Sequence, residues 1–131
     1  MFKRKSAKSA AINTLIGSNT TVQGDLLVSG GCHVDGRVVG NVTTAAGAQG
    51  FLSVSEQGAI EGSVDVAHVL LNGLVSGDIV ARERVELGSK ARVTGNVQYG
   101  IIEMALGAEI NGKLIHLPAG KAGEAKSVNE T

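Results

Sequence analysis

The residues of this 131-residue chain best suited to chemistry are one cysteine and three histidines, and their spacing defines no catalytic or metal site. Cys32 and His33 are adjacent, whereas His68 and His116 stand alone. A zinc site needs three or four such ligands, and the chain places only two together. The order of residues also indicates no Ser-His-Asp or Cys-His arrangement. We therefore expect no catalytic residue, no metal ion and no cofactor.

Segment 107–114, with the sequence GAEINGKL, comes close to a phosphate-binding P-loop. A P-loop ends in Ser or Thr, whose hydroxyl binds magnesium, and the last position here is Leu114. No strand-to-helix context surrounds the segment, and it contains one copy of the repeat described next. The sequence therefore predicts no nucleotide binding.

The dominant pattern of the chain is a repeat of an aliphatic residue, any residue, glycine, any residue and a second aliphatic residue. The copies begin at residues 22, 34, 60, 75, 93 and 110. The steps between them are 12, 26, 15, 18 and 17 residues, with a mean of about 17.6. A fixed period of this size is typical of a solenoid.

A second rhythm of six residues indicates the shape of each repeat. Aliphatic residues recur every six positions at Ile16, Val22, Val28 and Val34. Three such units give a coil with three short strands, one in each of three parallel sheets. The sequence thus predicts an all-β, single-stranded parallel β-helix of about six triangular coils over residues 15–117. Segment 43–50 has few large apolar residues, and we interpret it as a loop that is either a tolerated insertion or a partner-binding bulge.

Charge and composition limit the cellular compartment and the kinds of partner that are compatible with the sequence. The net charge is zero, but the first eight residues hold four positive charges and the remaining chain is about four units negative. A mildly acidic body argues against nucleic-acid binding. A single cysteine favours a reducing compartment, and no segment has the pattern of a membrane span or a secretory signal. We expect a cytoplasmic protein with a flexible basic tail at 1–14 and a disordered C-terminal tail at 118–131.

The chain as a whole resembles the bactofilins, a family of bacterial cytoskeletal proteins. The resemblance rests on the basic start Met1-Phe2-Lys3-Arg4-Lys5, the single repeat domain rich in glycine and valine, and the short polar C-terminal tail. It implies a right-handed β-helix that polymerises end to end without nucleotide. It also implies association with the inner face of the cytoplasmic membrane, and a role in cell shape and in placing cell-wall enzymes.

The resemblance also implies two sets of functional residues. The membrane-binding set, which would contact anionic lipids, is Phe2, Lys3, Arg4, Lys5 and Lys8. The polymer interface would use apolar residues of the terminal coils. These are Leu15, Ile16 and Val22 at one end, and Ile102, Ile110, Leu114 and Leu117 at the other. Where many bactofilins have a phenylalanine in the last coil, this chain has only aliphatic residues.

Two alternatives remain open from the sequence. The six-residue rhythm also fits the left-handed β-helix of hexapeptide-repeat acyltransferases, whose catalytic histidine would here be His33 or His68. The frame of six is lost and restarted, however, and the chain leaves little room for a substrate domain. The other alternative is an adaptor that binds envelope proteins without polymerising.

Overall fold

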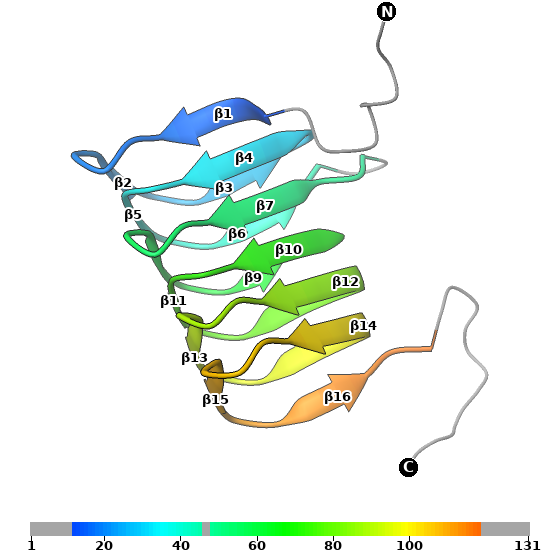
Figure 1. The fold of residues 1–131 in the computed structure, drawn as a ribbon. Coiled ribbons are helices and arrows are strands. Elements are labelled where there is room, and N and C mark those ends of the chain that lie inside the picture. Colours follow the sequence, from blue (N-terminus) through cyan, green and yellow to red (C-terminus); the bar gives the residue numbers. More distant parts are fainter. Residues whose placement is uncertain (1–11, 46–47, 119–131) are drawn as a thin grey trace, which may run out of the picture.

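The computed structural model describes residues 12–45 and 48–118, which form strands and contain no helix (Figure 1). The proposed membrane-binding residues lie outside this part of the chain. The strands are β1 (Ile12–Ile16), β2 (Thr21–Gln23), β3 (Leu26–Val28), β4 (Gly31–Val34), β5 (Arg37–Val39), β6 (Val42–Thr44), β7 (Phe51–Val54), β8 (Ala59–Glu61), β9 (Val64–Asp65), β10 (His68–Leu71), β11 (Leu74–Ser76), β12 (Ile79–Leu87), β13 (Arg92–Thr94), β14 (Val97–Met104), β15 (Glu109–Asn111) and β16 (Leu114–His116).

The strands stack into three parallel faces. The first face contains β1, β4, β7, β10 and the second halves of β12 and β14. The second face contains β2, β5, β8, β11, β13 and β15. The third contains β3, β6, β9, the first halves of β12 and β14, and β16.

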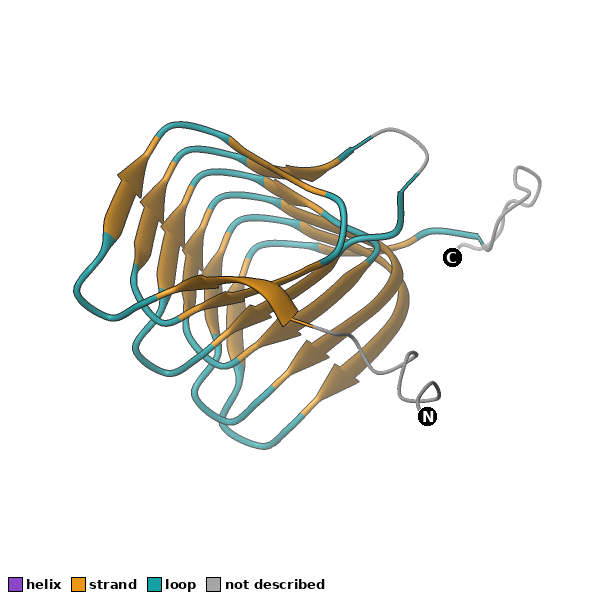
Figure 2. Cartoon of the chain, turned by 90° about the horizontal axis from the view of Figure 1, so that it is seen from above, coloured by secondary structure: helices purple, strands orange, loops and turns teal. Residues whose placement is uncertain are grey.

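Six coils result, with the first and last strands at opposite ends of the stack (Figure 1) and successive coils one behind another (Figure 2). The predicted single-stranded parallel β-helix of about six coils is confirmed. Its first strand begins at Ile12, three residues before the expected start.

The core consists of columns of small aliphatic side chains, each stacked on its equivalent in the next coil. On the second face the column Val38, Ile60, Val75 and Val93 is at most 1% exposed. On the third face Val42, Val64, Ile79 and Val97 form a similar column. The described residues bury no polar or charged side chain. β-Branched residues fit this interior because they pack well on a pleated surface.

The structure corrects the phase of one repeat. Register aligns Val22 with Val38 and Val38 with Ile60, so the second copy in the series begins at residue 38 and not at residue 34. Both segments match the pattern because they share Val38, and because Gly36 and Gly40 occupy two different corners of the same coil. The corrected steps are 16, 22, 15, 18 and 17 residues, which removes most of the irregularity.

The repeat glycines line the corner between the second and third faces, where the backbones of successive coils crowd together. At Gly77, φ is +154°, and an added Cβ would lie 2.2 Å from the carbonyl oxygen of Gly62 in the preceding coil. A contact under 3 Å with backbone cannot be relieved by moving a side chain. The same close approach, at 1.9–2.3 Å, recurs at Gly40, Gly62, Gly95 and Gly112. Glycine at the centre of the repeat is therefore a steric requirement.

The connection between β6 and β7 is the largest departure from regular stacking. Thr43 and Thr44 belong to β6, so the inserted segment begins at Ala45 and not at residue 43. Residues 45–50 make this corner, whereas two residues, 29–30, make the corresponding corner between β3 and β4.

We predict that Gly77→Ala destabilises the fold more than Gly24→Ala. Both glycines have a positive φ, so both variants carry similar backbone strain. Only Gly77 faces a neighbouring carbonyl, since nothing lies within 4 Å of an added Cβ at Gly24. The extra overpacking should lower the free energy of unfolding by about 1–3 kcal/mol, as measured by urea denaturation. Equal losses would show that backbone strain alone accounts for the requirement.

Candidate functional site

The C-terminal coil exposes the side chains that inner coils bury. Met104 is 45% exposed, while Leu87, its equivalent in the preceding coil, is 2% exposed. Leu114 is 47% exposed, and Val97 above it is fully buried. Ile102 and Ile110 end two other inward columns and are partly buried against the core. This end of the core is therefore an open apolar surface.

Leu106 lies at a corner of the same coil, in a position that is exposed in the other coils as well. It is 95% exposed in the turn 105–108, which a hydrogen bond from the Ala108 N–H to the Ala105 carbonyl closes at 3.2 Å. Three earlier coils have the same kind of turn, with Ser18, Glu56 and Ser89 at the equivalent position. A leucine replaces a polar residue only in the coil that has no successor.

The N-terminal coil is more closed. Ile16 and Val28 end two inward columns but are only 5% and 8% exposed, and Val22 and Leu26 are partly buried against the core. Leu15 is 64% exposed, but it pairs with the outward residue His33 and so lies on the side of the coil. The two ends of the solenoid are thus unequal.

The candidate interface residues near the C-terminal end therefore lie in two places. Ile102, Ile110 and Leu114 end core columns of the last coil, and the half-buried Leu117 follows β16. Sequence reasoning missed four exposed apolar residues of that coil, namely Ile101, Met104, Leu106 and Ile115. Comparing equivalent positions of successive coils would have revealed Leu106, because it alone is apolar in its series.

Within the described part of the chain, both end coils also have strand edges without a partner. β2 and β15 are the edge strands of the second face, and β3 and β16 each pair with one neighbour on the third face. An edge strand presents backbone donors and acceptors that another chain can pair with. The two ends therefore offer backbone hydrogen bonds, and the C-terminal end adds an apolar surface.

The structure does bring together a serine, a histidine and an aspartate, which sequence reasoning did not link. His33 Nδ1 lies 3.1 Å from Ser53 Oγ, and His33 Nε2 lies 3.0 Å from Asp35 Oδ1. β7 lies between β4 and β10, so its backbone N–H groups are engaged in the two ladders and form no oxyanion hole. These side-chain contacts connect the second coil to the third. His68, the other histidine considered, stacks on Phe51 with 5.9 Å between ring centroids.

Ionisable groups elsewhere form links between coils. Arg37 pairs with Glu61 and Arg84 pairs with Glu103 in the next coil, while Arg84 also pairs with Glu86 in its own strand. Burial raises the pKa of the Cys32 thiol, which lies in the core. Within residues 12–45 and 48–118, no three His, Cys, Asp or Glu side chains are grouped to hold a metal ion. In the same part of the chain, no helix is long and apolar enough to cross a membrane.

We predict that Asp35 contributes to acid stability. A hydrogen bond from Ser55, and then the neighbouring His33, lower the pKa of the Asp35 carboxyl. This contribution is fully present above the unfolded pKa of about 3.9 and is lost as the pH falls through the lower folded pKa. The melting temperature of Asp35→Asn should therefore fall less than that of the wild type between pH 6 and pH 3. Glu56→Gln, in the exposed turn 55–58, is the matched control, and a wild-type slope in Asp35→Asn would contradict the assignment.

Comparison of the sequence with known proteins identifies the family of the chain. A family model described as bactofilin, polymer-forming cytoskeletal, matches residues 14–115. Bactofilin BacO of Myxococcus xanthus is 30% identical over 113 residues, covering 86% of this chain and 85% of BacO. Bactofilin BacP of the same organism is 30% identical over 112 residues, which cover 86% of this chain but 45% of BacP. No solved structure matches significantly. The chain therefore belongs to the bactofilin family of polymer-forming cytoskeletal proteins.

Proposed function

We propose that the protein assembles end to end into filaments that need no nucleotide. The observation that carries the proposal is the open core of the last coil, where Met104 and Leu114 are about half exposed. Covering these side chains with a second chain would remove apolar surface from water, at about 25 cal/mol per Å². Burial of this kind supplies the free energy of assembly directly, so hydrolysis of a nucleotide is not required.

The strand geometry supports stacking as the mode of assembly. Strands in a sheet lie about 4.8 Å apart, so six coils form a rod of about 29 Å. A second rod that continues the sheets would pair the free backbone groups of both end coils. The contact then repeats the packing that already joins one coil to the next within the chain.

The filament would lie on the inner face of the cytoplasmic membrane, held by the basic N-terminal segment. Each Lys or Arg near an anionic surface contributes about 1 kcal/mol, and insertion of Phe2 adds roughly 1.5–3 kcal/mol. One segment gives weak binding, because ordering it has an entropic cost. A filament carries many segments, and each later attachment is effectively intramolecular.

The cellular role that follows is a scaffold for cell shape and for the localisation of cell-wall-modifying proteins. The family match to polymer-forming cytoskeletal proteins supports this role at its coarsest level. A polymer fixed to the membrane is suited to it, since it can hold many copies of a bound protein in one place.

We predict that the purified protein forms filaments without ATP or GTP, and that Leu106→Glu weakens their assembly. The fold should tolerate this change because Leu106 is 95% exposed. Losing the burial of one leucine, about 1.5–3 kcal/mol, should raise the critical concentration roughly 10- to 150-fold. Sedimentation and electron microscopy measure both effects.

Leu74→Glu is the matched control, because Leu74 is 40% exposed on the second face of an inner coil and pairs with Arg92. It should polymerise like the wild type. Monodisperse wild-type monomers at high concentration, or equal effects of the two variants, would contradict the proposed interface.

We further predict that deleting residues 2–8 releases the protein from anionic liposomes and leaves filaments intact. The deletion removes four positive charges and Phe2. Co-sedimentation with vesicles of phosphatidylglycerol and phosphatidylcholine measures binding, and neutral vesicles are the control. Unchanged co-sedimentation would exclude this segment as the anchor.

A further inference from the structure

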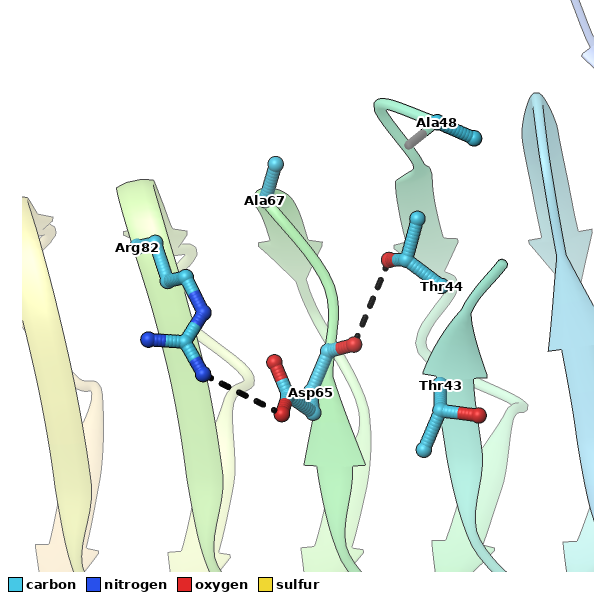
Figure 3. Close-up of a pocket in the computed structure, with 6 residues that line it drawn as sticks. All are labelled: Thr43, Thr44, Ala48, Asp65, Ala67 and Arg82. Carbon is cyan, nitrogen blue, oxygen red and sulfur yellow. Dashed lines mark hydrogen bonds and ion pairs between the residues drawn. The ribbon is translucent and has the colours of Figure 1, made fainter. Parts of the chain in front are cut away.

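The inserted corner between β6 and β7 creates a hollow on the side of the solenoid. Its lining residues come from β6, the inserted segment, β9 and its following corner, and β12 (Figure 3). They are Thr43, Thr44, Ala48, Asp65, Ala67 and Arg82. The hollow has a volume of about 280 Å³. It arises because the corner at Val66 and Ala67 is short, whereas longer or bulkier corners lie on both sides of it.

Specific contacts fix the described end of the inserted segment over this corner. The Gln49 side chain donates a hydrogen bond from Nε2 to Glu83 Oε2 at 3.2 Å, across 34 residues of sequence. Gly50 is buried, and a Cβ there would come within 2.9 Å of Thr44 Oγ1 and 3.1 Å of a Val66 methyl. The segment therefore packs on the solenoid where it rejoins β7.

The polar groups of the hollow are only partly used. Arg82 Nη2 lies 3.5 Å from Asp65 Oδ2, and these side chains are 67% and 46% exposed. A single long contact leaves donors on the guanidinium and an acceptor on the carboxylate available. The Thr44 hydroxyl donates to the Asp65 carbonyl at 3.2 Å. Figure 3 shows Arg82 and Asp65 reaching toward each other from neighbouring coils, with Thr43 nearby.

The hollow is smaller than most cofactor pockets, and its available polar groups match the donor and acceptor of a peptide group. Pockets for drug-sized ligands and cofactors usually measure about 300–1,000 Å³, and this hollow lies just below that range. A peptide group carries one N–H donor and one carbonyl acceptor. The Asp65 carboxylate can accept the first, and the Arg82 guanidinium can donate to the second. Ala48 and Ala67 leave room for small side chains.

We propose that this hollow binds an extended peptide segment of a partner protein. The site belongs to one chain, so it does not depend on polymerisation. It lies on the side of the solenoid and away from the end coils, so end-to-end assembly leaves it open. A filament would display one site in every subunit and would bind a clustered or multivalent partner more tightly than a single subunit does. Ala48, the described residue of the insertion that lines the hollow, would then take part in recognition.

The test uses a phage-displayed library of random twelve-residue peptides selected on the full-length protein. Ala67→Trp, which fills the hollow, serves for counter-selection. Enriched peptides should bind the wild type in fluorescence anisotropy and bind both Ala67→Trp and Arg82→Ala at least tenfold more weakly. Arg37→Ala is the matched control, because Arg37 also pairs with a carboxylate across coils but lies on the second face. It should bind like the wild type.

Circular dichroism of each variant establishes that the fold is retained. The selected peptides should also bind Leu106→Glu, which separates this proposal from the proposed filament. Failure to enrich any peptide over the filled variant would overturn the proposal. Equal binding to the wild type, Ala67→Trp and Arg82→Ala would overturn it as well.

Discussion

The close approach of backbones at the glycine corner is the constraint on which the rest of the structure depends. The carbonyl oxygen of one corner glycine occupies the place where a side chain would begin on the next, as for Gly62 and Gly77. Hydrogen bonding can therefore continue around the corner, and the Gly62 N–H donates to the Ser76 carbonyl at 3.0 Å. With this corner fixed, residues of equal register stack in columns, and the core becomes a set of parallel columns with two ends.

The proposed end-to-end assembly depends on where those columns end. In a core built of columns, each inward side chain is covered only by the equivalent side chain of the next coil. The core therefore has no boundary of its own at the end of a column. Among the described residues this cover is missing at the C-terminal coil, and Met104 and Leu114 are exposed. At the N-terminal coil, Ile16 and Val28 remain buried. In the proposed filament, most of the apolar burial would therefore come from the C-terminal coil.

Much of the fold could be predicted from the sequence, because period and glycine spacing are local properties of the chain. The six coils and the three faces follow from them. The phase of the second repeat did not follow, since segments 34–38 and 38–42 both satisfy the pattern. Side-chain contacts between different coils were even harder to predict from the sequence. His33 meets Ser53 only because the register there is offset by 20 residues, and the hollow beside Arg82 depends on an insertion of irregular length. The resemblance led to Ile102, Ile110 and Leu114 as interface candidates, but Met104 required the register.

The direction of the hydrogen bonds has a mechanical consequence. Ladder bonds between neighbouring strands run along the stack, so tension along a filament would stretch these bonds lengthwise. All bonds at one coil boundary share the load, and successive boundaries carry it in series. A filament would then be as strong as its weakest boundary, which is the one between subunits, because the covalent chain reinforces every boundary within a subunit. A filament of this kind would be stiff along its axis and would break at a defined place.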